Sequence, residues 1–147
     1  MTDPIRALPP APKPRGAYVP AVVMNGVAHS AGMTPRVAGD LYVRGKVGDE
    51  VSLELASEAA GIAAANALAA IAEAAGGLGR VSRLLRVTVY VACGAEFTDH
   101  SAVADGASTA LRGYLGDAAA AARTAIGVQS LPSGAPVEVE LIAALRP

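Results

Sequence analysis

Two side chains near the C-terminal end of the chain, an arginine and a glutamate, have the chemistry to handle a small acid. Arg123 lies in the run 122–128 and Glu138 in the run 137–144, and both runs are typical of strands. Arginine is a permanent cation whose planar fork of donors grips a carboxylate through two parallel hydrogen bonds. A nearby glutamate can orient the arginine or hold a water against the bound molecule. The sequence therefore suggests a small carboxylate-binding site on two strands that we expect to be neighbours.

Both residues also have a simpler structural explanation. Arginines on strands usually pair with an acid or face solvent, so Arg123 can equally form an ion pair with Glu138 or Glu140. Glu140 shares a strand face with Glu138, because side chains alternate along a strand, and spacing alone does not choose between the two acids. Taken by themselves, the residues favour the structural ion pair over a functional site.

The other reactive side chains lack the spacing of a known site. His29 and His100 lie on different predicted elements and, with one cysteine, do not form a metal-ligand pattern. We therefore expect no metal and no ribonuclease-like pair of histidines. Cys93 is expected to be a small, partly buried residue with no base beside it. The glycines within 76–79 follow a helix and precede a strand, which is the wrong order for a phosphate loop.

The composition is typical of a single soluble domain. The chain has 147 residues, a formal net charge of −1 and a hydrophobic content of 52%, mostly alanine and valine. Because small side chains each bury little area, we expect further burial between subunits and hence an oligomer. Arg80, Arg83 and Arg86 form the only local cluster of cations, which we interpret as solvated surface. With so few aromatic residues, this argues against nucleic-acid binding.

Three features indicate a cytoplasmic protein that is not inserted in a membrane. No secretory signal pattern is recognised. The apolar stretch 59–75 contains Asn66 and Glu73 and is expected to be a packed helix rather than a membrane span. The single Cys93 cannot form an intrachain disulfide, which fits a reducing compartment.

The order of elements predicts an α+β fold. A proline-rich arm, residues 1–16, precedes one domain over residues 17–147. Two helices are predicted, from Ser52 to a glycine cap at 76–77 and from about Asp99 to Gly116. With two strands before the first helix, one between the helices and two after, we expect one sheet with both helices on one face. The predicted strands are 18–23, 27–31, 84–91, 123–128 and 137–144.

The alternation of side chains along these strands predicts which face each occupies. Asn25 and Gly26 form the strongest hairpin signal of the chain, between the first two strands. In the third strand, Leu85 and the valines at 87, 89 and 91 are expected to face one way. The opposite face of the sheet is expected to carry Arg86, Thr88, Tyr90, Arg123, Glu138 and Glu140.

Six short stretches, in the same order, resemble the RidA/YjgF family of imine deaminases, whose members were once called translation inhibitors or endoribonucleases. The resemblance covers roughly residues 16–145. It implies a chorismate-mutase-like α+β fold, and a homotrimer whose sheets form a central β-barrel with a cleft at each subunit interface. The stretches are Gly16–Pro20, Ala31–Pro35, Ala64–Leu68, Phe97 with Asp105–Ser108, Ala122–Thr124, and Leu131–Pro132 with Val137–Glu140.

The resemblance also implies an activity, the hydrolysis of small carboxylated imines or enamines without a metal or organic cofactor. Carried onto this sequence, it makes Arg123 the carboxylate clamp and Glu138 the acid that positions the attacking water. Tyr18 becomes the aromatic wall of the cleft. Several positions depart from the pattern of the family: Ala31 replaces a serine, Met33 a glutamine, Asp105 an asparagine and Ala125 a cysteine.

These departures leave two alternatives to the deaminase open. One is a non-catalytic trimer that binds small molecules or acts as a holdase. The other is an enzyme of the same type that acts on a different, larger substrate, for which small residues in the cleft make room. Asp105 matters most, because a negative charge beside the clamp weakens binding of an anionic substrate unless that acid is paired or points away.

Overall fold

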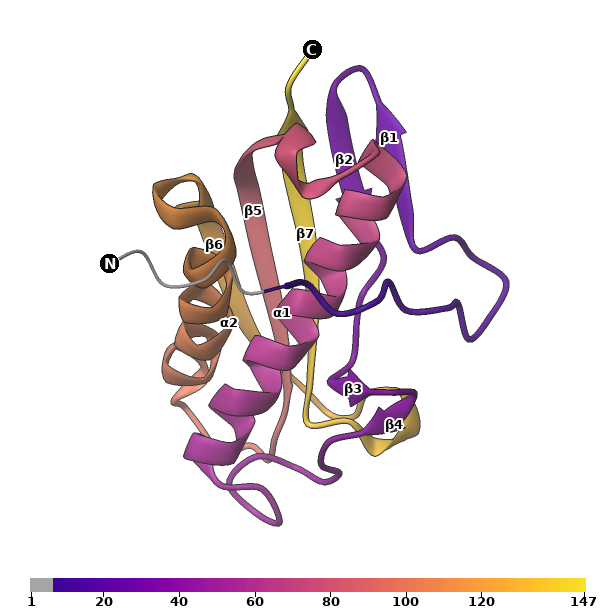
Figure 1. Cartoon of the computed structure of the whole chain (residues 1–147). Coiled ribbons are helices and arrows are strands. Elements are labelled where there is room, and N and C mark those ends of the chain that lie inside the picture. The colour runs from indigo at the N-terminus through magenta and orange to yellow at the C-terminus, as the bar shows by residue number, and fades with distance from the viewer. Residues whose placement is uncertain (1–6) are drawn as a thin grey trace.

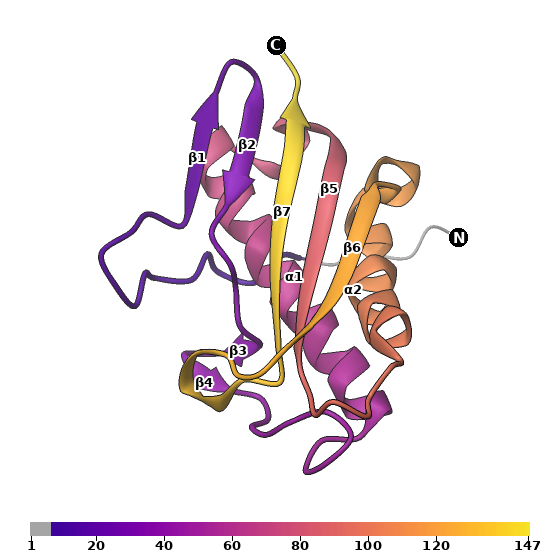
Figure 2. The same cartoon turned by 180° about the vertical axis from the view of Figure 1, so that it is seen from behind.

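The fold is a five-stranded mixed sheet with two helices packed on one face (Figures 1 and 2). A computed structural model describes residues 7–147, so residues 1–6 of the predicted proline-rich arm lie outside the described part. The strand order is β1-β2-β7-β5-β6, in which β5 and β6 are parallel and the other pairs are antiparallel. The predicted α+β class, with both helices on one face, is confirmed.

The elements follow the chain in nearly the predicted order. The stretch 32–48, for which no strand is predicted, contains a two-stranded hairpin of its own, β3 and β4. The strands are β1 (Ala21–Met24), β2 (Val27–Ser30), β3 (Arg36–Val37), β4 (Asp40–Leu41), β5 (Val81–Ala92), β6 (Ala122–Val128) and β7 (Val137–Leu145). The helices are α1 (Leu53–Ala75) and α2 (His100–Leu115), with three short 3-10 turns at Leu78–Arg80, Gly116–Ala119 and Pro132–Gly134.

The turns and caps have the residues that their backbone geometry demands. Asn25 and Gly26 have φ values of 51° and 75°, as a tight hairpin turn with both central residues in the left-handed region requires. The side chain of Ser52 caps α1 by accepting a hydrogen bond from the backbone nitrogen of Leu55 at 3.1 Å. Gly76 ends the helix with φ of 93°, so both predicted ends of α1 are confirmed.

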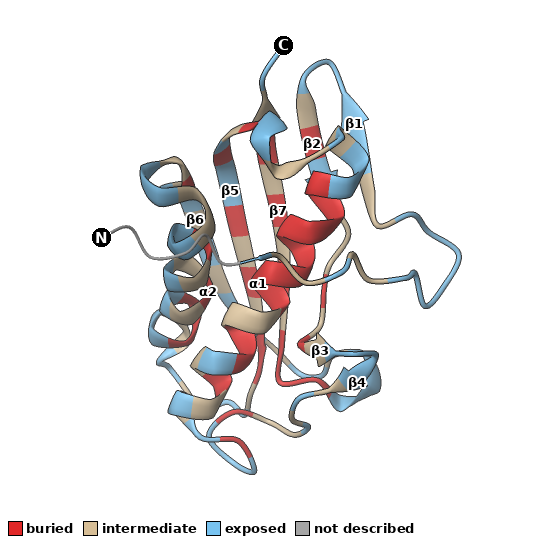
Figure 3. Ribbon diagram, viewed as in Figure 1, coloured by how far each residue is buried: buried red, intermediate tan, exposed pale blue. Residues whose placement is uncertain are grey.

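The central helix α1 is buried on most of its surface (Figure 3). It is the one helix of the described residues that is long and apolar enough to cross a membrane by length and composition, but 72% of that stretch is buried inside the fold. Alanines make up most of its buried residues, and their small side chains let the helix lie close to the sheet. The prediction of a packed helix agrees with this burial.

At two glycines the backbones of the two helices come close together. A Cβ atom at Gly106 of α2 would overlap the carbonyl oxygen of Ser57 in α1. A Cβ atom at Gly61 would lie 3.2 Å from the carbonyl oxygen of Gly106. The backbones therefore approach more closely than any larger residue allows, and this contact sets the position of α2 above β5 and β6.

Asn66 is a polar side chain in the core and ties α1 to the loop after β2. It is 4% exposed, and its Nδ2 atom donates to the carbonyl oxygens of Thr34 and Arg36 at 3.2 and 3.0 Å. We expect Asn66→Ala to lower the free energy of unfolding by about 1–3 kcal/mol, because two partly buried carbonyls lose their donor. Urea denaturation measures the change, and an unchanged midpoint would show that other contacts hold this loop.

The strand β5 departs from the predicted alternation at one position. Its register with β7 shifts between Leu84 and Arg86, so Leu84 is fully buried while Leu85 is 40% exposed. The prediction that Leu85 faces the same way as the three valines was wrong, because a bulge moves one extra residue to the open side. The three valines that follow in β5 are buried as predicted.

Candidate functional site

The strands that carry Arg123 and Glu138 are not neighbours. β5 lies between β6 and β7 and pairs with both. Arg123 pairs with the buried Val87 and therefore faces the helices, whereas Glu138 pairs with Tyr90 on the open face. The predictions that the two strands adjoin and that both residues share the open face were wrong. Alternation fixes the relative faces of residues within one strand but not between strands.

The guanidinium of Arg123 lies against α2 and uses both terminal nitrogens there. Its Nη1 donates to Oδ1 of Asp105 at 2.8 Å and to Oγ of Ser108 at 3.0 Å. Its Nη2 donates to Oγ of Ser101 at 2.8 Å and to the carbonyl oxygen of the same residue at 3.3 Å. The four terminal N–H groups are thus engaged, so an incoming carboxylate must displace one of these partners or use the Nε–H group.

Asp105 is the acid that pairs with Arg123, in place of the Glu138 or Glu140 pairing considered from the sequence. The side chain of Asp105 is 69% exposed, and that of Arg123 is 22% exposed. Exposed ion pairs contribute only about 0.2–1 kcal/mol, so a ligand can replace this carboxylate at low cost. The arginine is therefore held in a fixed position with a replaceable partner.

Glycine at position 127 makes room for a cysteine–histidine pair on the same face of β6. Sγ of Cys93 lies 3.5 Å from Nε2 of His100, and the ring of Phe97 packs edge-on against His100 with centroids 5.4 Å apart. A Cβ atom at Gly127 would lie 2.6 Å from Nε2 and 3.1 Å from Sγ. The prediction that no base lies beside Cys93 was wrong, because a short loop returns the chain from β5 into α2.

Ala125, the residue that stands where the resemblance has a cysteine, lies between these two groups along β6. It pairs with the buried Val89, so it shares the helix-facing side of β6 with Arg123 and Gly127. The helix-facing side of this edge strand therefore carries Arg123, Ala125 and Gly127 in succession, that is, one cation followed by one small side chain and one glycine. A ligand held by Arg123 would meet no bulky side chain from β6 itself.

The open face of the sheet holds a second group of polar residues, as predicted for β5 and β7. The hydroxyl of Tyr90 donates to Oε1 of Glu140 at 2.8 Å, and Nη1 of Arg86 donates to Oγ1 of Thr124 at 2.8 Å. The hydrogen bond to Glu140, followed by burial, raises the pKa of Tyr90. Arg80 and Arg83 donate to the carbonyl oxygens of Arg146 and Ala120, and all three arginines of the predicted cation cluster are exposed, which agrees with solvated surface.

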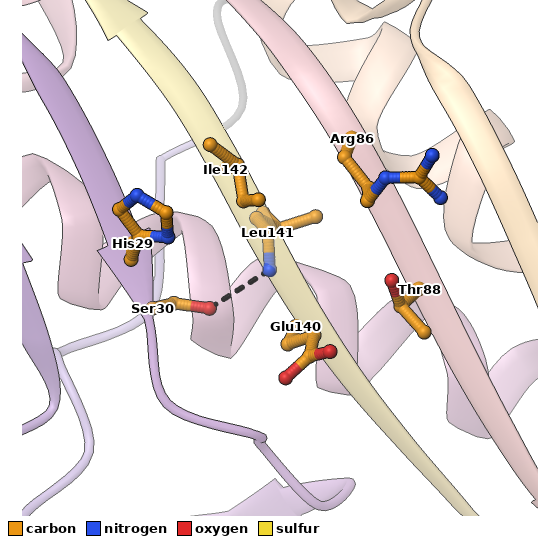
Figure 4. A pocket seen from close by; sticks show the side chains of 7 residues that line it. All are labelled: His29, Ser30, Arg86, Thr88, Glu140, Leu141 and Ile142. Carbon is orange, nitrogen blue, oxygen red and sulfur yellow. Dashed lines mark hydrogen bonds between the residues drawn. The ribbon is translucent and has the colours of Figure 1, made fainter.

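A small pocket of about 120 Å³ opens on this face between β2, β7 and β5 (Figure 4). Oγ of Ser30 accepts a hydrogen bond at 2.9 Å from the backbone nitrogen of Leu141 at its floor. The pocket does not include Arg123, which lies on the other face of the sheet. Its lining residues are His29, Ser30, Arg86, Thr88, Glu140, Leu141 and Ile142.

Glu138 is half-buried beside the loop that follows β2. A Cβ atom at Gly32 would lie 2.8 Å from the carboxyl carbon of Glu138, so glycine at this position leaves room for the acid. This loop also carries Ala31, and Met33 bridges β7 through Val139. Burial, and to a smaller extent the charge of Glu140, raises the pKa of Glu138. A carboxyl group shifted in this direction is better suited to proton transfer near neutral pH.

The raised pKa of Glu138 predicts a pH-dependent stability. Because the folded state favours the protonated acid, ionisation costs stability, and this cost grows as the pH rises from the ordinary value of 4.5 through the raised one. We expect Glu138→Gln to increase the free energy of unfolding at pH 7 and to change it little at pH values below the ordinary one. Urea denaturation at both pH values measures this, with Glu73→Gln on the exposed end of α1 as the control. An equal gain at both pH values would contradict it.

Tyr18 lies at the opposite edge of the sheet from Arg123. It precedes β1, which is one edge strand, whereas Arg123 belongs to β6, the other edge strand (Figure 1). Its ring is 47% exposed, and its hydroxyl accepts a hydrogen bond from the backbone nitrogen of Arg15 at 3.2 Å. Within one copy of the chain, Arg123 is therefore brought together with Asp105, but not with Tyr18 or Glu138.

The chain is similar to a described family over nearly all of its length. The family model for Endoribonuclease L-PSP matches residues 9–145. Protein TCP17 of Trypanosoma cruzi is 32% identical over 140 residues, which cover 95% of this chain and 88% of that protein.

Two solved structures share the fold. The protein Atu1372 of Agrobacterium tumefaciens, described as of unknown function, has a TM-score of 0.85 at 33% identity, covering 88% of this chain and 83% of that one. A proposed endoribonuclease of Shewanella oneidensis MR-1 has a TM-score of 0.89 at 25% identity, covering 95% and 92%. Together with the family model, they confirm the resemblance seen in the sequence. The chain therefore belongs to the endoribonuclease L-PSP family, that of the RidA and YjgF proteins, and has its chorismate-mutase-like α+β fold.

Proposed function

We propose that this protein hydrolyses small carboxylated imines or enamines, with release of ammonia, at clefts between copies of the chain. Membership of the family supports a hydrolytic role on small molecules. The observation that carries the proposal is the set of partners that hold the side chain of Arg123. Its guanidinium is fixed by Ser101 and Ser108 of α2, and among residues 7–147 the exposed Asp105 is the one charged group bound to it.

Assembly of the proposed cleft requires more than one copy of the chain. Arg123 lies on one edge strand and Tyr18 beside the other, so a single copy cannot place both against one small ligand. If the β6 edge of one copy meets the β1 side of the next, Arg123 of the first faces Tyr18 of the second. Repeating this contact around a closed ring gives the homotrimer that we propose.

Exposed apolar residues on both edge strands, β1 and β6, support contacts between copies. Val22, Val23 and Met24 of β1 are 51%, 42% and 67% exposed, and Ile126 of β6 is 47% exposed. Edge strands with unpaired backbone groups and apolar side chains are usually covered by a partner. Light scattering after size exclusion tests the assembly, and a stable, active monomer would contradict it.

In the proposed reaction, Arg123 binds the substrate carboxylate and Glu138 of a neighbouring copy positions a water. The water oxygen bonds to the imine carbon while its proton passes, through the carboxylate, to the imine nitrogen. This gives a carbinolamine, whose hydroxyl proton passes to the amino nitrogen as the carbon–nitrogen bond breaks, so that ammonia leaves and a 2-keto acid remains. Imines are already electrophilic, so orientation together with a fixed cation can provide much of the acceleration.

The direct test generates 2-imino acids in solution and measures their lifetime. An amino-acid oxidase produces the imine, semicarbazide traps it, and the absorbance of the trapped adduct reports what remains. We expect the wild-type protein to suppress the adduct and to release ammonia in equal amount. An unchanged adduct signal across short, branched and aromatic side chains would contradict the deaminase proposal.

The engaged donors of Arg123 favour a second candidate, a trimer that binds carboxylates without turnover. In that case a 2-keto acid should bind with a measurable heat while the imine assay shows no acceleration. Ala31 and Ala125 favour a third candidate, since small residues leave room for a larger substrate. Faster hydrolysis of bulky imines than of small ones would support an enzyme with such a substrate.

A further inference from the structure

Three arginines that are far apart in the sequence converge beside the β3–β4 hairpin and the turn before β7. Nη2 of Arg15 and Nη1 of Arg36 both donate to the carbonyl oxygen of Gly39, at 2.6 and 2.9 Å. Nη2 of Arg36 donates to Oγ of Ser133 at 3.1 Å, and Nη1 of Arg44 donates to the carbonyl oxygen of the same serine at 2.7 Å. Two backbone turns thus hold three guanidinium groups in one place.

The positive charge of this arginine cluster, Arg15, Arg36 and Arg44, is not neutralised by neighbouring carboxylates. Among residues 7–147 the only ion pair within 4.0 Å is the one between Arg123 and Asp105. Burial, followed by the charges of Arg15 and Arg44, lowers the pKa of Arg36, and the charge of Asp40 opposes this only in part. Three cations facing one acid leave an excess of positive charge.

The cluster also keeps hydrogen-bond donors for a ligand. Nε of Arg36 is buried and has no partner among the described residues. Buried donors without a partner are rare in folded proteins. The bonds to Gly39 and Ser133 use only some of the terminal N–H groups of the three side chains. The remaining donors can therefore serve an oxyanion.

The backbone beneath the cluster is held in an unusual conformation. Ala38 and Ser133 have φ values of 52° and 61°, in the left-handed region that residues with a side chain seldom adopt. In these conformations Gly39 and Ser133 present their oxygens to the arginines. Such local strain is typical of binding and catalytic sites, where surrounding contacts maintain it.

We propose that Arg15, Arg36 and Arg44 form a binding site for a phosphate group, either inorganic phosphate or the phosphate of a small metabolite. Guanidinium forks match the oxygens of phosphate, and the excess charge suits a dianion better than a single carboxylate. The site does not contain Arg123, which lies on the other edge strand, so it does not depend on the proposed deaminase activity. Arg15 links it to Tyr18 through a hydrogen bond, which places it at the β1 side of the molecule.

Calorimetric titration with inorganic phosphate at constant ionic strength, balanced with chloride, tests this site. We expect saturable binding by the wild-type chain, and about tenfold weaker binding for each of Arg15→Gln and Arg44→Gln, since each loses a charge-assisted contact. Both positions are exposed, so these variants should fold even if Arg36→Gln does not. Arg112→Gln, at an exposed arginine on α2, should bind phosphate as the wild type does.

Further ligands distinguish the sources of the anion and the possible failures. A phosphorylated metabolite that binds more tightly than inorganic phosphate, with the same loss in Arg15→Gln and Arg44→Gln, identifies the metabolite as the ligand. No saturable phosphate binding by the wild type would overturn the proposal, as would equal binding by the cluster variants and by Arg112→Gln. Tighter binding of malonate than of phosphate would also overturn it. None of these results depends on the outcome of the imine assay.

Discussion

Replacing Arg123 with glutamine is expected to reduce kcat/KM for 2-imino acids by about a hundredfold or more. Glutamine keeps a hydrogen-bonding group but loses the charge and the planar fork that orient a carboxylate. Fixed electrostatic groups of this kind contribute about 10²–10³ to the rates of hydrolytic enzymes. The semicarbazide assay measures the loss, and the circular dichroism spectrum should stay unchanged because the side chain is partly exposed.

Asp105→Asn provides the matched variant for this prediction. It retains an oxygen that can accept from Nη1 of Arg123 but removes the negative charge that competes with substrate. We therefore expect a lower KM for carboxylated imines with kcat largely unchanged. Loss of activity in this variant together with full activity in Arg123→Gln would reverse the roles of the two residues and contradict the clamp.

Replacing Gly106 with alanine is expected to lower the free energy of unfolding by about 3 kcal/mol. The added Cβ atom would overlap the carbonyl oxygen of Ser57, and backbone atoms cannot turn aside as a side chain can. The helices must therefore separate. Overpacking of a core usually lowers the free energy of unfolding by about 1–3 kcal/mol, and we expect the upper end of that range. Urea denaturation followed by circular dichroism measures the change.

Gly113→Ala in the same helix is the control for this effect. Nothing lies within 4 Å of the Cβ atom that it would add, and the residue is exposed. Alanine is a better helix former than glycine, so this variant should gain about 0.5–1 kcal/mol. A similar change of stability in both variants would show that helix propensity, rather than the contact with Ser57, governs position 106.

Local signals in the sequence predict most of the fold. The cap at Ser52, the hairpin at Asn25 and Gly26, and the glycines after each helix determine where elements begin and end, and the structure confirms them. The bulge at Leu85 was missed because it depends on pairing with β7, and no alternation within β5 reveals it. The order of the elements predicted the single sheet with both helices on one face, and the family resemblance identified its chorismate-mutase-like type.

The geometry of the candidate site could not be predicted from the sequence. The structural alternative for Arg123 was an ion pair with Glu138 or Glu140, yet its partner is Asp105 on a helix rather than an acid on the next strand. Tertiary packing decides on which side of β5 the last strand pairs. β7 pairs with β5 on the side opposite to β6, so β6 and β7 are not adjacent. The pairing of Cys93 with His100 depends in the same way on a loop and on Gly127.

The tethering of Asp105 to the same fold as Arg123 has a consequence for selectivity. A tethered group competes as though it were present at a millimolar or higher effective concentration. Simple monocarboxylates such as acetate, when scarcer than this, should therefore fail to occupy the arginine. A ligand binds Arg123 only when contacts beyond its carboxylate offset the free energy lost by breaking the ion pair with Asp105. The ion pair thus favours ligands that make further contacts over simple acids present below that concentration.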